Sequence, residues 1–174
     1  STATIHGPIV SLDAFGLASS TPGSPDARAR ACLADALSSA AGGALERALE
    51  CATGVYQDEE VAIELRLEAA KLCVDWHSAR GSYDRCRRVA GDAARLGARV
   101  LERDHPLVLM LRNSEAYWLS VLGFNDMAAR RFGALVADVK ACRGSTLRLR
   151  RDSQYSAMPW KNTGQVEQGG PRLS

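Results

Sequence analysis

One segment, Asp104 to Phe132, constrains the fold of this chain more than any other. Asp104 can cap a helix, and Pro106 suits the first helical turn because its missing N–H would have no partner there. Gly123 can adopt the left-handed conformation that ends a helix, and Asn125 can begin a second one. We therefore predict two helices joined by about three residues, which must be antiparallel neighbours.

The apolar residues of this segment follow helical spacing, and the chain repeats the pattern. The packing positions are Leu111, Trp118 and Leu122 in the first helix and Ala128, Phe132, Leu135 and Val139 in the second. Two helices cannot bury these faces alone, so further copies are expected. A shift of 42 residues places Gly123 on Gly81, and a further step of 38 reaches Gly43. The sequence therefore predicts three consecutive helical hairpins.

Several residues of the same segment match a known repeat. They are Asp104-His105-Pro106, Arg112-Asn113, Ala116, Leu119, Leu122-Gly123, Ala128 and Phe132. In this pattern the chain resembles the 42-residue tetratricopeptide repeat of the kinesin-light-chain-like type, common in high-GC bacterial proteins. The match is good over residues 81–143 and weaker over 59–80, and it departs where Glu115 replaces a large apolar residue and Ala90 an aromatic one. The resemblance implies an all-α fold, with antiparallel helical hairpins stacked as a short tetratricopeptide-like α-solenoid.

The chain divides into three parts. Residues 1–23 mix Gly, Pro, Ser and Thr without periodicity and are expected to be a flexible leader. Residues 24–144 are expected to form the helical repeat domain, with helices at about 25–41, 44–56, 58–80, 82–103, 106–122 and 125–143. Residues 145–174 form either a degenerate capping segment or a disordered tail, because Pro159 would break a helix there.

Composition favours a helical protein without a membrane span. The chain is 46% apolar and 24% charged, with only 6% aromatic residues, which suits close helix packing better than a sheet sandwich. No run approaches the roughly eighteen apolar residues of a membrane span, and we see no secretory signal, so a cytoplasmic location is expected. A formal charge of +2 is too small to predict a nucleic-acid partner. The first residue is not Met, so the chain could be a piece of a longer protein.

The helix expected at residues 82–103 has two unusual features. Gly91 and Gly97 would each destabilise it by about 1 kcal/mol relative to alanine, so we predict that they permit close approach of another helix. The same helix has a stripe of basic residues, which we interpret as a solvated face in preference to a phosphate-binding one. These residues are Arg85, Arg87, Arg88, Arg95, Arg99 and Arg103.

No catalytic or metal-binding constellation stands out in the sequence. Cys73 and His77 lie four residues apart on one helical face, but no compact second pair accompanies them to complete a zinc site. We interpret them as a buried thiol beside a hydrogen-bonded histidine, with a metalloprotein as the weakest alternative. We expect no enzymatic activity and no cofactor. The cysteines are widely spaced and odd in number, so we interpret them as buried thiols and not as a disulfide framework; they are Cys32, Cys51, Cys73, Cys86 and Cys142.

The resemblance also implies a binding surface. In tetratricopeptide arrays the first helix of each hairpin lines a concave groove that holds an extended peptide or a partner helix. The matching positions are Glu68, Lys71, Asp75 and Ser78 in one repeat and Met110, Asn113, Tyr117 and Ser120 in the next. Asn113 can donate to and accept from a peptide backbone, and Tyr117 offers apolar area with a polar tip.

These features lead to a functional hypothesis with one alternative. We interpret the chain as a non-catalytic module that binds a protein or peptide ligand in a bacterial signalling or regulatory context. The alternative is the sensor part of a transcriptional regulator or protein kinase whose effector domain is not in this chain. Exposed faces of the first and last hairpins could also stack between chains to form a homo-oligomer.

Overall fold

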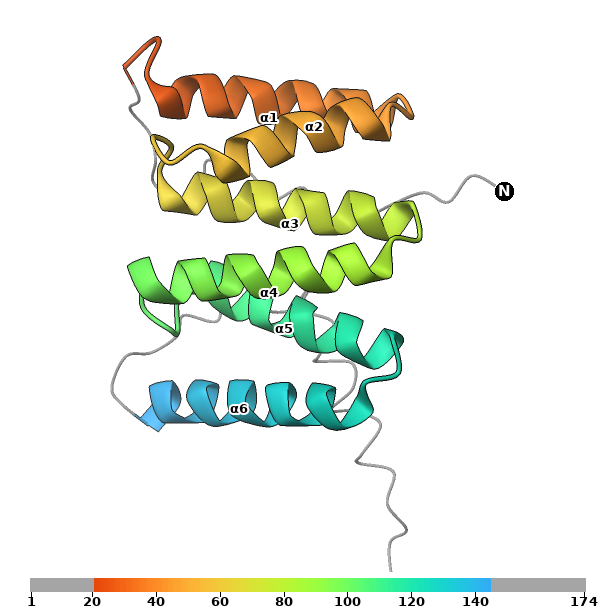
Figure 1. Ribbon diagram of the computed structural model, residues 1–174. Coiled ribbons are helices and arrows are strands. Elements are labelled where there is room, and N and C mark those ends of the chain that lie inside the picture. Colours follow the sequence, from red (N-terminus) through yellow and green to blue (C-terminus); the bar gives the residue numbers. More distant parts are fainter. Residues whose placement is uncertain (1–20, 145–174) are drawn as a thin grey trace, which may run out of the picture. The chain divides into compact units, whose positions relative to one another are not determined.

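The computed structural model describes residues 21–144, which form six α-helices and contain no β-strand. The helices are α1 (Pro25–Ala41), α2 (Leu45–Gln57), α3 (Ile63–Ala79), α4 (Tyr83–Val100), α5 (Pro106–Val121) and α6 (Asn125–Gly144). Each helix packs against the next one in sequence, and α3 also contacts α1 and α5 (Figure 1). The all-α prediction is confirmed for this part of the chain. Residues 1–20 of the predicted leader and the predicted cap or tail at 145–174 lie outside the described residues.

The same turn ends α1, α3 and α5. In each turn a glycine adopts a positive φ, with 87° at Gly43, 73° at Gly81 and 87° at Gly123. The N–H of the next residue then donates to a carbonyl five residues back, as in the Schellman motif. These bonds are Ala44 to Ser39 (2.8 Å), Ser82 to His77 (2.8 Å) and Phe124 to Leu119 (2.9 Å). The predicted equivalence of the three glycines is therefore confirmed.

The helix starts follow the sequence signals less closely. The Ser24 hydroxyl caps α1 by accepting a hydrogen bond from the N–H of Ala27 at 3.1 Å. The prediction that Asp104 caps α5 is wrong, because Pro106 is already the first helical residue and His105 precedes it. His105 Nδ1 accepts from the N–H of Leu107 at 3.3 Å and serves as the cap. The helix predicted at 82–103 ends earlier, since Leu101 is already extended.

Two glycines of α4 let neighbouring helices approach closely, as the sequence predicts. A Cβ atom at Gly97 would lie 2.8 Å from a methyl carbon of Leu67 and 2.8 Å from one of Val108. A Cβ at Gly91 would lie 2.7 Å from a carboxylate oxygen of Glu115. Gly97 therefore makes room for apolar packing from α3 and α5, whereas Gly91 makes room for the buried carboxylate of Glu115.

The cysteines divide into two kinds. Cys32 of α1 and Cys51 of α2 form a disulfide, with a Cα–Cα distance of 6.2 Å. The prediction that all five cysteines are thiols is wrong for this pair, because the α1–α2 turn brings the two half-buried positions face to face. Cys73 and Cys86 are buried free thiols, as predicted. Burial raises the pKa of both thiols, that of Cys86 to about 11.

No helix in residues 21–144 is long and apolar enough to cross a membrane.

Candidate binding face on α3 and α5

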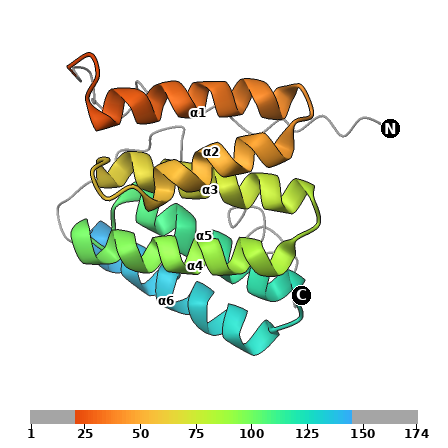
Figure 2. The same ribbon diagram turned by 45° about the horizontal axis from the view of Figure 1, so that its top comes forward.

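The eight predicted groove positions fall on two helices that contact each other. Glu68, Lys71, Asp75 and Ser78 belong to α3, and Met110, Asn113, Tyr117 and Ser120 belong to α5. The two sets differ by the same 42 residues that separate Gly81 from Gly123. Because α3 contacts α5, the structure places the two sets on neighbouring helices. Figure 2 shows α2 and α4 in front of these two helices.

The side chains at these positions differ widely in exposure. Glu68 and Asn113 are buried, with 7% and 2% of their surface exposed. Tyr117 is 43% exposed, and Ser120 is also exposed. The remaining four are half-buried, namely Lys71, Asp75, Ser78 and Met110. Lys71 and Asp75 form an ion pair along one turn of α3. The two sets therefore offer one exposed aromatic ring and one exposed hydroxyl, whereas the amide of Asn113 and the carboxyl group of Glu68 are buried.

Glu68 is a buried carboxyl group whose ionisation is finely balanced. The pKa of Glu68 is raised to about 7, and burial is the main cause. The guanidinium of Arg30 on α1 opposes this shift, and the neighbouring charge of Glu64 adds to it. Its Oε1 atom is buried and accepts no hydrogen bond. Near neutral pH the protonated and ionised forms are both present, so a hydrogen-bond donor brought to Oε1 would favour the ionised form.

Asn113 has a buried amide oxygen without a donor. Its Oδ1 atom accepts no hydrogen bond, although the side chain is almost fully enclosed. A buried acceptor left in this state destabilises a protein by about 1–3 kcal/mol. The oxygen keeps its capacity to accept a hydrogen bond from a further donor. A peptide N–H is a donor of the required kind.

Tyr117 is exposed but supported by other rings. Its ring meets that of Trp118 edge to face, with centroids 4.9 Å apart. Trp118 in turn stacks on Tyr83 of α4 at 5.3 Å. Ring pairs of this geometry stabilise the arrangement by about 0.5–1.5 kcal/mol beyond the area they bury, and the tyrosine side of the pair remains exposed. In the sequence, Trp118 was predicted only as a packing residue, and its contact with Tyr117 was not predicted.

Arg30 is a second residue that was not predicted to belong to this face. It lies 38 residues before Glu68, the same step that separates Gly43 from Gly81. Its charge acts on the pKa of Glu68 from α1, a helix that contacts α3. If Gly43 is aligned with Gly81, Arg30 takes the position equivalent to Glu68 and Met110.

Cys73 and His77 do not belong to a larger cluster of metal ligands. Within residues 21–144 no group of three or more His, Cys, Asp or Glu side chains could hold a metal ion. The Thr53 hydroxyl and the Cys73 thiol share a hydrogen bond of 3.7 Å. The expectation of a hydrogen-bonded histidine is wrong at one atom, because the buried Nδ1 of His77 has no partner. Burial and the charges of Arg85 and Arg80 lower the pKa of His77.

Comparisons of the chain with protein-family models, with curated proteins and with solved structures find no match.

Proposed function

We propose that this chain is a helical-repeat module that binds a protein or peptide segment on the face formed by α3 and α5. Two observations support the repeat: the turn after α1 recurs after α3 and α5 with the same bonds, and α3 contacts both α1 and α5. In this proposal the helices form a short tetratricopeptide-like α-solenoid, in which the first helix of each hairpin faces the ligand. The setting would be regulatory, with no catalytic step.

The observation that carries the proposal is the pair of unpartnered oxygen atoms on adjacent helices. Glu68 Oε1 and Asn113 Oδ1 are both acceptors, and both are buried without a donor. An extended peptide offers backbone N–H groups at regular intervals and so supplies donors of this kind. Tyr117, held by Trp118, would cover an apolar side chain of the same ligand.

A peptide library displayed on phage and selected on the full chain tests the proposal. Peptides recovered from the selection are then measured against Asn113→Ala and Tyr117→Ala. We expect each substitution to weaken binding about tenfold or more. The matched control is Asn125→Ala, because Asn125 is exposed at the start of α6.

A melting temperature measured for each variant separates binding from folding. Because Asn113 Oδ1 has no partner, its removal is expected to leave stability unchanged or to raise it. Peptides that bind all three variants as tightly as the parent chain would contradict the proposed face. A strong loss of stability in Asn113→Ala would show that the amide has a structural partner instead.

A further inference from the structure

The two outer helices of the described stack, α1 and α6, bury few side chains (Figure 1). Three residues of α1 are buried, namely Ala29, Leu33 and Ala36, and only Leu33 is large. In contrast, α3 has the same length of 17 residues and buries nine of them. Because apolar burial stabilises in proportion to the area removed from water, non-covalent packing holds α1 more weakly than α3.

The disulfide between Cys32 and Cys51 reinforces this weakly packed helix. Both cysteines are half-buried, so a thiolate from solution can reach their sulfur atoms. Cys73 and Cys86 are only 2% and 0% exposed, and burial raises the pKa of both thiols. A thiol that lacks both access and thiolate character takes little part in disulfide exchange. Reducing agents in solution therefore act on the α1–α2 disulfide and not on these two buried thiols.

Polar side chains of α1 also support α3. Asp26 Oδ1 accepts a hydrogen bond from the N–H of Ala62 at 2.8 Å. Ala62 directly precedes α3, so Asp26 provides an acceptor at a helix start, where N–H groups lack partners within the helix. The charge of Arg30 opposes the rise in the pKa of Glu68 that burial causes. A movement of α1 away from the stack would remove both interactions from α3.

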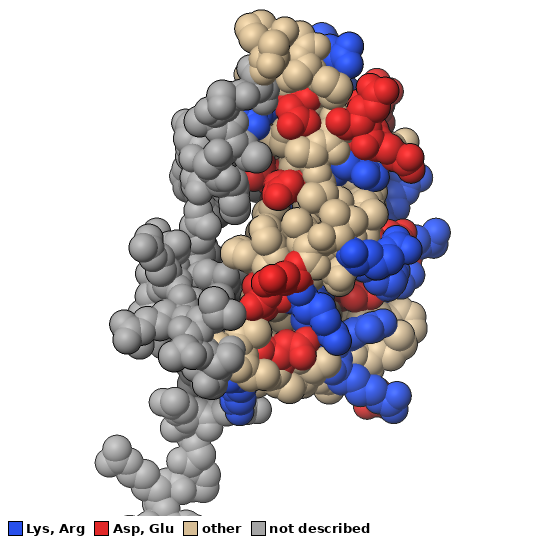
Figure 3. Space-filling view, turned by 90° about the vertical axis from the view of Figure 1, so that its left-hand side faces the viewer, with Lys and Arg blue, Asp and Glu red and all other residues tan. Residues whose placement is uncertain are grey.

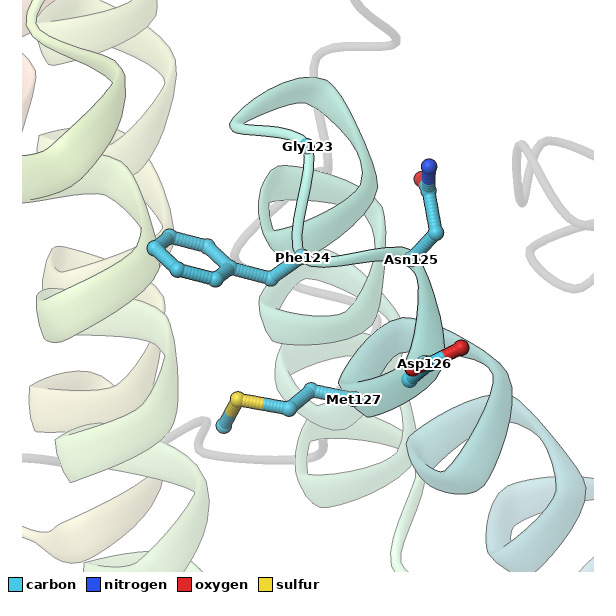
Figure 4. A pocket seen from close by; sticks show the side chains of 5 residues that line it. All are labelled: Gly123, Phe124, Asn125, Asp126 and Met127. Carbon is cyan, nitrogen blue, oxygen red and sulfur yellow. The ribbon is translucent and has the colours of Figure 1, made fainter.

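The helix at the other end of the stack, α6, offers a comparison because an ion pair holds it to its neighbour. Asp138 of α6 lies 2.7 Å from Arg112 of α5. Figure 3 shows acidic and basic side chains next to one another over the lower part of the face, where α4 to α6 lie. Figure 4 shows the turn that joins α5 to α6, where the exposed side chains of Phe124 and Met127 point to the same side. Reduction of a disulfide leaves these contacts unchanged.

We propose that the Cys32–Cys51 disulfide is a redox-sensitive switch: when an external dithiol reduces it, α1 separates from α2 and α3 while the other helices stay folded. One thiolate of the dithiol attacks a sulfur of the pair, forms a mixed disulfide and releases the other cysteine as a thiolate, which takes up a proton. The second thiol of the reductant then displaces the remaining cysteine and closes the reductant's own disulfide. The chain gains two electrons and two protons, and the dithiol loses them.

Separation of α1 would change the molecule in two ways. It would uncover α2 and α3 where α1 packs on them. It would also remove the side chains of Asp26 and Arg30 from α3, the helix that carries Glu68. The switch would therefore act on the proposed binding face as well. Its evidence is the disulfide and the small buried surface of α1, so it does not depend on whether a peptide binds there.

Hydrogen–deuterium exchange of the full chain, measured by mass spectrometry, tests the switch. Dithiothreitol serves as the dithiol, and alkylation of Cys32 and Cys51 in a parallel sample shows that the disulfide has opened in the folded chain. In the oxidised chain we expect the amides of both α1 and α6 to be protected. In the reduced chain we expect those of α1 to exchange within about tenfold of an unstructured peptide, while those of α6 keep at least about tenfold more protection. Replacing dithiothreitol by oxidised glutathione should restore the protection of α1.

Two variants make the test specific. Cys32→Ser/Cys51→Ser should release α1 without any reductant and should not respond to dithiothreitol. Cys142→Ser leaves the disulfide in place and should respond as the parent chain does.

Three outcomes would overturn the proposal. In the first, dithiothreitol fails to open the disulfide in the folded chain. In the second, α1 stays as well protected as α6 after reduction. In the third, all the helices lose protection together, because the disulfide would then stabilise the whole fold and not the position of α1.

Discussion

The α1–α2 pair and the α4–α5 pair hold two helices together in different ways. A disulfide between Cys32 and Cys51 crosses the first pair. In the second pair, Gly91 and Gly97 of α4 allow the backbone to come close to side chains of α5. The first contact is covalent and joins half-buried positions, whereas the second depends on the absence of side-chain atoms.

The two devices act on different states of the chain. A disulfide stabilises chiefly by restricting the unfolded chain, so its contribution depends on the length of the loop that it closes. Close packing at a glycine acts on the folded state, because an added methyl group must displace its neighbours. Mutations in the two pairs should therefore change stability by different amounts and for different reasons.

The largest change in the free energy of unfolding is expected when the Cys32–Cys51 disulfide is reduced. Its cysteines are 19 residues apart in sequence, and a loop of that order contributes about 3 kcal/mol in the chain-entropy model. Unfolding by guanidinium chloride, with and without a reducing agent, measures this free energy. The double variant Cys32→Ser/Cys51→Ser should match the reduced parent chain and should not respond to the reducing agent. If the reducing agent leaves the guanidinium chloride midpoint of the parent chain unchanged, the disulfide does not stabilise the α1–α2 pair.

The second effect concerns Glu68 on α3, the helix that contacts both α1 and α5. Its pKa in the folded chain is about 7, against 4.5 for the unperturbed group. Between these values the folded state binds more protons than the unfolded one, so stability decreases as pH rises. Each unit of pKa shift is worth about 1.4 kcal/mol, which gives about 2 kcal/mol between pH 5 and pH 7.

Glu68→Gln removes this titration and isolates it. We expect the stability difference between the parent chain and the variant to change by about 2 kcal/mol between pH 5 and pH 7. Urea unfolding at constant ionic strength measures the difference. The lowered pKa of His77 affects both proteins equally and cancels. A difference that is constant with pH would show that Glu68 is solvated or paired in solution.

The sequence predicts backbone conformation better than contacts between helices. The three turn glycines were identifiable because a positive φ strongly favours glycine. The disulfide was not, because cysteine spacing says nothing about which faces of α1 and α2 meet. On the candidate face, repeat spacing placed Asn113 and Glu68 correctly on α5 and α3. Their burial could not be predicted, since it depends on how closely the neighbouring helices pack.

A third effect, at Gly97, measures close packing directly. Gly97→Ala would place a methyl group 2.8 Å from carbon atoms of both Leu67 and Val108. Overpacking of this kind destabilises a core by about 1–3 kcal/mol, offset by about 1 kcal/mol from the better helix propensity of alanine. We therefore expect a net loss of up to about 2 kcal/mol in the free energy of unfolding, measured by chemical denaturation. The loss should shrink in a Val108→Ala background, and a loss that is unchanged there would place the strain elsewhere.

The smallest effect is expected at Gly91, where the neighbour is the flexible end of a side chain. Gly91→Ala would crowd the carboxylate of Glu115, which can move away at the expense of its contacts with Arg95 and Arg131. The carboxylate is buried, but both guanidinium groups are more than half exposed and lie 3.5 and 3.9 Å from it, so these contacts contribute about 1 kcal/mol or less. The gain in helix propensity should nearly cancel their loss. The net change should therefore lie within about 1 kcal/mol of zero.

Measuring Gly91→Ala in a Glu115→Ala variant shows whether the carboxylate opposes the added methyl group. Without the carboxylate, Gly91→Ala meets no obstacle from Glu115 and should stabilise the chain by about 1 kcal/mol through helix propensity alone. The coupling energy from the four proteins of this cycle then reports the packing of the carboxylate against the glycine. A coupling energy near zero would mean that Gly91 is not required by Glu115. The two glycines of α4 would then differ in kind, with Gly97 fixed by apolar packing and Gly91 free to be replaced.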